Sequence, residues 1–549
     1  MALRGPPMFE RWKTGEHAPL WRLRYMFVCH FTQALFIVLP YTVSVYMVRD
    51  FLVAGAAPGQ PVPEQRVGVL TGALGAVSSA AALLTSYPLG ALSDRVGRKA
   101  VILVGLASSV ASLLWYGAAP SLSQALAARA LGGAFNGVIG AEKAMIGDCC
   151  DARAATRAFS LFSLAWGVGA LFAPVLGGGL SRPCAGALAG ATWACGDAGA
   201  PLRRWPYLLP CAVSAALCAL ALALCALGLE ETLPGKCGDE GLGSGQASLN
   251  LSLASSVQLS VRREGGLDSV SLDWPADDRP GQVGPEAEAA TLLPQKTDGR
   301  TAPGPDGAGA QLPHTAWHKD RLVILCLIGY GAVAFIYNLF DELLPLFASA
   351  PRSEGGLELQ PSGLAPSNAF GGAVLILFTL LGLGPALRAL GVLPVTRLGL
   401  WCVLPFAVLV PLASEAPPGR GVLLQATLFA GQALRSTSAA TAFTGCLILV
   451  NAAAQRCGAL GAVNGAGQAL ASAVRAAGPL AGGGLWAGAV ALGGAPWFPR
   501  AALQYVPFAA LALVAMLAQV LYLHVHLPLE GGGEERGAQD DAEAPPLRS

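Results

Sequence analysis

Charge is what this sequence lacks most. Only 13% of its 549 residues are Asp, Glu, Lys or Arg, and 54% are hydrophobic, whereas soluble globular domains carry about 25% charged residues. The formal net charge is +1, so no overall positive field favours nucleic acid as a partner. These shortages exclude an ordinary soluble domain and give no reason to expect a nucleic-acid-binding protein.

Motifs for metal binding and for nucleotide hydrolysis are also missing. The 13 cysteines are scattered, and no spacing resembles a zinc site. The chain contains no G-x-x-x-x-G-K-[ST] loop, the phosphate-binding motif that an ATP-driven pump would need. We therefore predict that the protein is not an enzyme, requires no cofactor and holds no metal.

Long apolar windows, by contrast, are abundant. A spanning helix needs about 20 apolar residues, and the chain offers roughly a dozen such windows. We predict an all-α membrane protein whose twelve transmembrane helices form two pseudo-symmetric six-helix bundles in the lipid bilayer. The expected spans lie at about 25–47, 67–89, 100–115, 124–146, 158–180, 205–229, 321–348, 364–387, 394–413, 421–450, 458–490 and 503–527.

Composition divides the chain into five segments. A basic leader (1–24) precedes the first bundle (25–234), and an acidic tail (528–549) follows the second bundle (320–527). Between the bundles, residues 235–319 are rich in Gly, Ser, Pro and charge, so we predict a disordered linker. An even number of spans on each side of the linker predicts that both termini are cytoplasmic, in an endomembrane such as the vacuole or in the plasma membrane.

An internal repeat supports the division into two bundles. The sequence from Pro174 to Leu180 recurs from Pro479 to Leu485, at an offset of 479 − 174 = 305 residues. Arg129 has a counterpart in Arg435 at nearly the same offset, 435 − 129 = 306. Small residues let membrane helices approach closely, so we assign the repeat to helix packing. The residues of this packing signature are Gly169, Pro174, Gly177, Gly178, Gly478, Pro479, Gly482 and Gly483.

A short charged stretch, Gly90-Ala-Leu-Ser-Asp94-Arg-Val-Gly97-Arg98-Lys99, separates the second and third expected spans. We expect a loop in which Gly90 and Gly97 permit a tight turn and Asp94 pairs with Arg98. A related sequence begins at Gly384, but it has lost the acid and the lysine. The basic residues favour the cytoplasmic side of the membrane.

Glu142 and Lys143 lie about 20 Å from Arg129 along the expected fourth span, at 1.5 Å per residue. That distance places them close to the charged loop. We predict a gating network of salt bridges in preference to a contact with substrate. Its members are Gly90, Asp94, Arg95, Gly97, Arg98, Lys99, Glu142 and Lys143.

Several other polar residues lie inside expected spans, where a charge costs about 2.5–3.5 kcal/mol. Arg129 is therefore expected to face the bundle interior, either for function or in a structural ion pair or carbonyl clamp. Asp341 and Glu342 are candidates for accepting a proton or a cation, or are solvated acids at a helix end. Arg475 is a candidate for binding an anionic group, or for a hydrogen bond between helices. The full set of candidates for proton coupling or substrate binding is Arg129, His30, Asn136, Asn338, Asp341, Glu342, Arg435, Asn464 and Arg475.

Two further features concern modification and sorting. Cys184 and Cys195 share an expected external loop, where they form a disulfide or remain thiols. Glu288, Leu292 and Leu293 fit an acidic dileucine signal for sorting adaptors, a short pattern that also occurs by chance.

The charged stretch and the repeat resemble signature motifs of the major facilitator superfamily. G-x-L-x-D-x-x-G-R-K resembles the loop between helices 2 and 3, and Arg129 followed by glycines resembles a helix 4 motif associated with proton coupling. The segment at Pro174 resembles the antiporter signature of helix 5, although Ala173 stands where glycine is usual. The resemblance implies a twelve-helix transporter.

Other segments resemble the zinc-induced facilitator-like group. The chain departs from that group by lacking a Cys-Pro-Gly-Cys stretch and by having Leu339 where an acid is usual, which argues against direct metal handling. The resemblance implies proton-coupled antiport of a small organic solute, such as a metal chelator, an organic acid or a drug-like compound. A uniporter of sugar-like solutes and a transport-dead receptor or scaffold are the alternatives. The segments that carry the resemblance begin at Ala134, Ala165, Pro206, Tyr337, Gly355 and Gly461.

Overall fold

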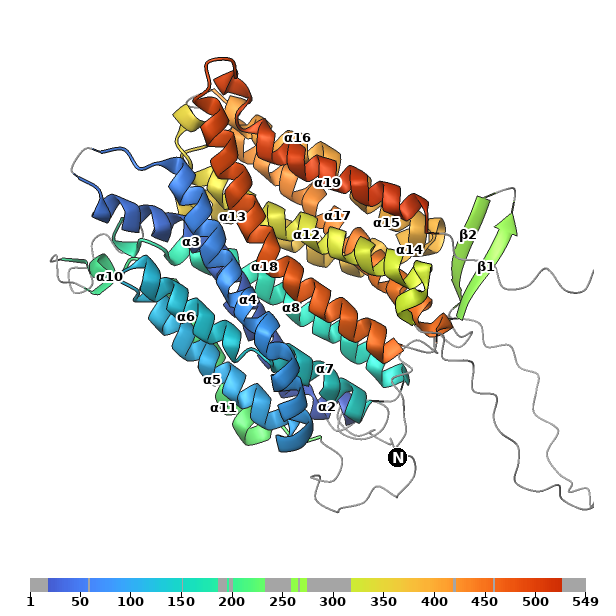
Figure 1. The fold of residues 1–549 in the computed structure, drawn as a ribbon. Helices are drawn as coiled ribbons and strands as arrows, with labels where there is room; N and C mark the ends of the chain where they lie inside the picture. Colours follow the sequence, from blue (N-terminus) through green and yellow to red (C-terminus); the bar gives the residue numbers. More distant parts are fainter. Residues whose placement is uncertain are drawn as a thin grey trace, which may run out of the picture.

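The computed structural model describes residues 18–57, 60–150, 152–185, 195–196, 201–232, 258–264, 267–273, 317–417, 421–457 and 460–525. These residues form two helical halves that pack along a shared seam (Figure 1). The first half contains α2 (Ala18–Arg22), α3 (Arg24–Gly55), α4 (Glu64–Val96), α5 (Arg98–Gly117), α6 (Leu122–Ala134), α7 (Val138–Cys149), α8 (Ala152–Leu180), α10 (Pro201–Arg204) and α11 (Leu208–Gly228). The second half contains α12 (Arg321–Ser349), α13 (Pro361–Leu381), α14 (Leu383–Leu390), α15 (Val392–Trp401), α16 (Val403–Leu412), α17 (Gly421–Arg456), α18 (Leu460–Gly493) and α19 (Tyr505–Leu523).

The all-α membrane architecture predicted from the sequence is confirmed. Among the described residues, nine helices are long and apolar enough to cross a membrane. The other three expected spans correspond to α6 with α7, to α8 and to α18. Since those segments do not meet the same criterion, the count of twelve stays a prediction.

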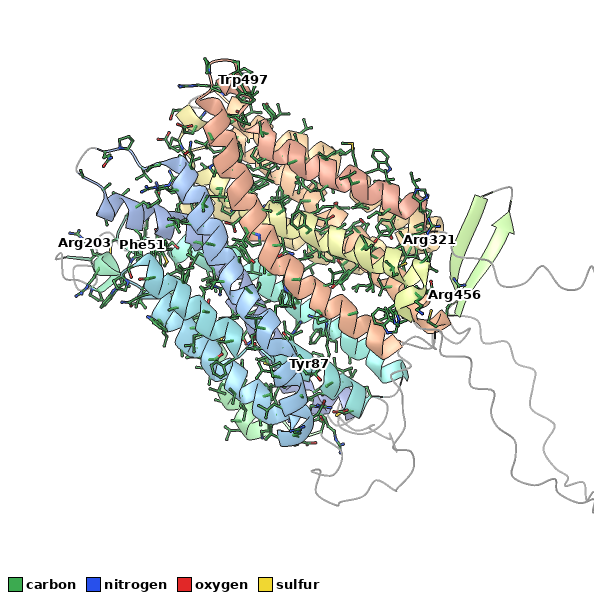
Figure 2. All side chains as sticks on the ribbon, in the orientation of Figure 1. Phe51, Tyr87, Arg203, Arg321, Arg456 and Trp497 are labelled. Carbon is green, nitrogen blue, oxygen red and sulfur yellow. A yellow bond between two sulfur atoms is a disulfide. The ribbon has the colours of Figure 1, made fainter. Side chains whose placement is uncertain are left out.

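The long helices run between two ends of the molecule. We call one the Pro63 end, because α3 and α4 are joined there just before α4 begins, and the other the Gly97 end, where α4 meets α5. Figure 2 shows Phe51 and Trp497 toward the Pro63 end and Arg321 toward the Gly97 end. The ionic contacts of the candidate functional site lie near one of these ends or between them.

The repeated glycines and prolines lie where helices approach closely. In the seam between the halves, a Cβ added to Gly72 of α4 would collide with the carbonyl of Pro479 in α18. At the second contact between halves, a Cβ on Gly178 of α8 would collide with Ala365 of α13. The repeat therefore packs α4 on α18 and α8 on α13, as its pseudo-symmetry requires. Within one half, added Cβ atoms would meet Phe31 and Ala34 at Gly169, Thr42 at Gly177 and Asn338 at Gly478.

Two loops predicted from polar sequence are shorter than expected. The expected loop at 90–99 is wrong, because α4 continues to Val96 and α5 begins at Arg98, so that Gly97 alone joins them. Gly97 has a φ of 112°, whereas Gly90 is helical and has nothing within 4 Å of an added Cβ. The first expected span, which ended at about residue 47, is also too short, since α3 reaches Gly55. A helix that projects beyond the lipid needs no apolar residues, so an apolar window does not mark its end.

The fourth expected span is not one helix. It is divided into α6 and α7 by a break at residues 135–137, where Asn136 N donates to Gly133 O and Gly137 N donates to Phe135 O. Glycine lowers helix propensity by about 1 kcal/mol, and Gly132, Gly133 and Gly137 cluster here. The average hydropathy of an apolar window does not reveal such a break in a helix.

Two short strands are described within the segment 235–319, and disorder of the linker as a whole stays a prediction. Strands β1 (Gln258–Glu264) and β2 (Leu267–Asp273) form an antiparallel hairpin that pairs Val261 with Val270 and contacts α14 (Figure 1). The alternation of apolar and polar residues over seven positions suits a strand but is too short to stand out in sequence. The leader before residue 18, the sorting signal Glu288-x-x-x-Leu292-Leu293 and the acidic tail lie outside the described residues.

Candidate functional site: ionic groups between and at the ends of the halves

Ionisable side chains from both halves gather around Tyr41 of α3. The Tyr41 phenol lies within electrostatic range of Arg129 from α6, of Asp341 and Glu342 from α12, and of Arg475 from α18. We call these five residues the central cluster. The sequence predicted four of them, but an isolated tyrosine in an apolar helix gives no signal, so Tyr41 was missed.

Glu342 occupies the junction of α4, α12 and α18. Its side chain is 3% exposed, and a Cβ added to Gly75 of α4 would lie 3.0 Å from Oε2. A Cβ added to Gly482 of α18 would lie 3.0 Å from the Cβ and Cγ of Glu342. Oε1 is buried without a hydrogen-bond partner, and no cation of the described residues lies within 4.0 Å. Glu342 is thus a buried acid at the seam between the halves, not a solvated helix end.

Asp341, its neighbour, is paired. It forms an ion pair with Arg435 of α17. The Arg435 guanidinium also lies 5.9 Å from the Tyr337 ring centroid and 5.8 Å from that of Phe340, and the Tyr337 hydroxyl lies 2.5 Å from Ser438 Oγ. Arg435 therefore has both a counter-ion and two aromatic faces.

Arg129, like Arg435, lies against two aromatic rings, but among the described residues it has no carboxylate partner. It is 3% exposed, its Nη1 donates to Phe36 O at 3.3 Å, and its guanidinium lies 5.4 Å from the Phe36 centroid and 6.0 Å from that of Tyr116. Its Nε is buried with no partner. In the described part of the chain no carboxylate lies within 4.0 Å of Arg129, so the carbonyl clamp anticipated from the sequence is present and the ion pair is not.

Glu142 and Lys143 of α7 do not join Asp94 and Arg98, so that part of the predicted gating network is wrong. Glu142 Oε2 instead lies 2.7 Å from Nδ1 of His30 in α3, and both side chains are buried. Lys143 Nζ donates to Gln468 Oε1 of α18 at 3.0 Å, across the two halves. Consecutive residues point about 100° apart on a helix, so they reach different neighbours.

Aromatic rings enclose the Glu142–His30 pair. The His30 ring stacks on Phe162 with centroids 3.3 Å apart, and the Trp166 centroid lies 5.3 Å away. Cys29 and Lys143 also interact with Glu142, and Cys225 of α11 contacts Cys29. Lys143 interacts with both Glu142 and Arg475, so it connects the pair to the central cluster.

The charged motif at the Gly97 end forms all its described contacts within the first half. Arg98 pairs with Asp94, and its Nε donates to Asp148 Oδ2 at 3.2 Å. The backbone N–H groups of Arg98 and Lys99 donate to the Glu231 carboxylate at 2.9 and 3.1 Å, which places a negative charge at the N-terminus of α5. Lys99 Nζ donates to the carbonyl of Ala226 at 2.9 Å, and Arg95 is exposed. The sequence did not identify Asp148 and Glu231, although Glu231 ends the sixth expected span.

A second ionic network, which the sequence did not predict, joins the two halves at the Pro63 end. We call Asp50, Arg182, Tyr207 and Gln360 the Pro63-end lock. Arg182 pairs with Asp50 and donates from Nη1 to Gln360 Oε1 of the other half at 2.9 Å. The Tyr207 hydroxyl donates to Asp50 Oδ2 at 2.5 Å, and burial together with the Asp50 carboxylate raises the pKa of Tyr207.

Three contacts support the lock. The Tyr46 hydroxyl donates to Leu359 O at 3.1 Å, and Arg49 contacts both Glu64 (2.9 Å) and Ser349 (3.5 Å). These contacts also join α3 to the second half. Nearby, Cys184 and Cys195 are bonded in a disulfide, which decides between the two alternatives left open by the sequence.

The remaining predicted residues have local roles or are not described. Asn338 Nδ2 donates to Ala334 O of its own helix at 2.7 Å. Asn136 lies in the break between α6 and α7, where its Oδ1 is buried without a partner. The side chain of Asn464 lies outside the described set, and Arg475 donates to Ser472 Oγ at 2.9 Å. Within the described ranges, no group of three or more His, Cys, Asp or Glu residues is placed to hold a metal ion.

Two helical halves with an ionic cluster between them and charge networks at both ends define a membrane transporter. The chain belongs to the Major Facilitator Superfamily, whose sequence model matches residues 26–417.

Its relatives within the superfamily include a fungal and a plant group. The chain is 29% identical over 418 residues to the Major facilitator superfamily multidrug transporter mfsB of Aspergillus fumigatus, covering 71% of this chain and 67% of that protein. It is 25% identical over 466 residues to Protein ZINC INDUCED FACILITATOR-LIKE 1 of Arabidopsis thaliana, covering 85% and 84%. The crystal structure of the human organic anion transporter MFSD10 (TETRAN) shares the fold, with a TM-score of 0.54 at 17% identity over 94% of this chain and 100% of the other. The chain is thus a transporter related to the zinc-induced facilitator-like group.

Proposed function

We propose that the protein is a proton-coupled antiporter that exchanges a small organic solute for protons by alternating access. The observation that carries the proposal is Glu342, a buried carboxyl that lies between the halves with no cation of the described residues within 4.0 Å. An unpaired buried charge is costly, and a bound proton removes that cost. Relatives that include a multidrug transporter support an organic solute as the substrate.

Glu342 would couple proton binding to the seam between the halves. Gly75 of α4 and Gly482 of α18 close on its side chain, and a protonated carboxyl fits that dry contact. After the proton leaves, the charged carboxylate requires water, so the seam must part at this point. Such a difference in stability between two arrangements is what a proton needs in order to shift their populations.

The networks at the two ends would act as alternating gates. At the Pro63 end, Arg182 and Gln360 link the halves, and toward the other end Lys143 and Gln468 do so. Separation of the halves at either end breaks the corresponding contact. The buried contact between His30 and Glu142 would hold α7, and therefore Lys143, in position.

The same proposal includes an orientation. Arg95, Arg98 and Lys99 lie at the Gly97 end, and basic residues favour the cytoplasmic face. We therefore propose that this end and both termini face the cytosol, in an endomembrane or the plasma membrane. Tags fused to either terminus of the full chain in cells should be accessible only from the cytosol, and the same tags reveal the membrane.

Reconstituted protein tests the coupling. Proteoliposomes that contain a pH-sensitive dye are given an imposed pH gradient, with 2-naphthoate and ethidium as an anionic and a cationic organic probe. Wild-type protein should accumulate a probe in proportion to the gradient. Glu342→Gln, which cannot release a proton, should still exchange the probe but lose the response to the gradient.

A second acid serves as the control. Glu230 is a surface acid, 66% exposed and 3.6 Å from Arg22, so Glu230→Gln should behave as wild type. Probe flux that ignores the gradient in wild-type protein would rule out proton coupling and favour a uniporter.

A further inference from the structure

The charges between the two halves do not balance. Of the described acids in this region, Asp341 is neutralised by Arg435 and Glu142 contacts His30. Three cations remain that have no carboxylate of the described chain within 4.0 Å, namely Arg129, Lys143 and Arg475, and Glu342 is the one acid near them without a partner.

Arg129 is the most incompletely satisfied of the three. A guanidinium has five N–H donors, and the described contacts of Arg129 are one hydrogen bond, to the neutral carbonyl of Phe36, and two ring faces. Its Nε is buried and has no acceptor. A cation at 3% exposure is stable when an anion or a set of acceptors completes its coordination.

The other two cations have the same deficit. Lys143 is held by the amide oxygen of Gln468, and Arg475 by the hydroxyl of Ser472, both neutral acceptors. Lys143 lies within electrostatic range of Arg475, which repels it, and of Glu142, which attracts it, and Arg475 and Arg129 both lie within range of Tyr41. A negative group between Lys143 and Arg475 would relieve their repulsion, and Tyr41, within range of both Arg475 and Arg129, connects this position to Arg129.

We propose that Arg129, Lys143 and Arg475 form the binding site for the anionic group of the transported solute, so that the substrate is an organic anion such as a carboxylate or a sulfonate. The inference rests on the proposed transport function. The three residues come from α6, α7 and α18, on both sides of the seam, so the anion bridges the two halves. Release of the anion leaves the cations to repel each other, which favours separation of the halves.

Binding without a gradient tests the site. The purified full-length protein in detergent is heated with naphthalene-2-sulfonate, which is anionic at every working pH, and with its neutral analogue naphthalene-2-sulfonamide. The sulfonate should raise the melting temperature and the sulfonamide should not. Arg129→Gln should weaken sulfonate binding by about 10- to 100-fold, the loss that corresponds to hydrogen bonds with a charged group, and Arg129→Lys should recover part of it.

Two further variants distinguish binding from folding. Arg475→Gln should weaken sulfonate binding in the same direction if Arg129→Gln proves unstable. Arg388→Gln removes an exposed arginine outside the cluster and should leave binding unchanged. Equal binding of sulfonate and sulfonamide, no binding of sulfonate or 2-naphthoate, or equal losses in the Arg129 and Arg388 variants would each overturn the proposal.

The outcomes separate this inference from proton coupling. Anion binding together with flux that ignores a pH gradient would retain the anion site and reject the antiport. Gradient-driven transport of ethidium by a protein that binds no anion would retain the antiport and reject the anion site.

Discussion

Arg129 and Arg435 occupy equivalent places in the two halves, and they differ in one respect. Each guanidinium faces two aromatic rings, Phe36 and Tyr116 in the first half and Tyr337 and Phe340 in the second. Arg435 has a counter-ion in Asp341, whereas the nearest described partner of Arg129 is a carbonyl. The repeat therefore contains two equivalent arginines, and among the described residues only the second has a carboxylate partner.

The joints at the Gly97 end also differ between the halves, in the opposite sense. Gly97 and Gly391 each link two helices with a positive φ, 112° and 81°. A Cβ at Gly97 would collide with the carboxylate of Glu231, which binds the N-terminus of α5. Near Gly391, the position equivalent to Asp94 is Arg388, which is exposed. At this joint, therefore, the first half has a charge-dependent contact, and its counterpart in the second half has an exposed arginine instead.

The largest effect is expected from the two glycine joints. Gly97→Ala should lower the free energy of unfolding by about 3 kcal/mol or more, because left-handed strain costs about 1–2 kcal/mol and displacement of Glu231 removes hydrogen bonds to a charged group worth about 1.5–3 kcal/mol. Gly391→Ala should cost the strain alone. Thermal unfolding in detergent measures both, and equal losses would show that Glu231 contributes nothing at the joint.

The next effect comes from giving Arg129 the counter-ion that Arg435 has. Asp341 follows Phe340, so its equivalent follows Phe36 and is Ile37 (340 − 36 = 304 and 341 − 304 = 37). Ile37→Asp should pair with Arg129 and weaken binding of naphthalene-2-sulfonate by about tenfold or more, since 1.4 kcal/mol corresponds to a factor of ten.

The uncharged variant Ile37→Asn has nearly the same shape and is the matched control. It should retain most of the sulfonate affinity. An equal loss in the Asp and Asn variants would mean that packing at position 37, rather than charge, controls the site.

The sequence predicted this asymmetry only in part. The scarcity of charge and the length of the apolar windows led to the helical membrane fold, and the repeat led to the two halves, because both depend on composition over many residues. Arg129, Asp341, Glu342 and Arg475 were identified because charge inside an apolar helix is costly wherever the helix packs. Those arguments do not require knowledge of which residues contact one another in the folded protein.

Partners could not be predicted in the same way. Glu142 was assigned to Asp94 and Arg98 by its distance along one helix, but the break at residues 135–137 and the direction of the side chain bring it to His30. Arg182 and Glu231 were missed because charged residues at helix ends resemble solvated residues until the tertiary contacts are known. Their partners are 132 and 133 residues away, at Asp50 and Arg98.

The smallest effect concerns how the two halves cap a helix at the Gly97 end. The N-terminus of α5 is capped by the distant Glu231, whereas that of α12 is capped by the adjacent Asp320, which accepts from Leu322 N at 2.8 Å and Val323 N at 3.3 Å. Although burial opposes it, hydrogen bonds from the Cys457 thiol and these amides lower the pKa of Asp320.

Asp320→Ala should therefore cost about 1 kcal/mol of stability, the usual value for an N-cap, and Asp320→Asn much less. A carboxyl whose pKa is lowered on folding stabilises the protein above its unfolded pKa and ceases to do so as the pH falls through its folded pKa. The difference in melting temperature between wild type and Asp320→Asn should thus be largest near neutral pH and shrink in acid. Glu231→Gln also loosens the joint at Gly97, so it should lower stability more than Asp320→Asn does. A difference that is constant from neutral to acidic pH would show that the charge of Asp320 does not contribute to stability. The cap of α12 would then depend on local hydrogen bonds alone, whereas that of α5 depends on the distant Glu231.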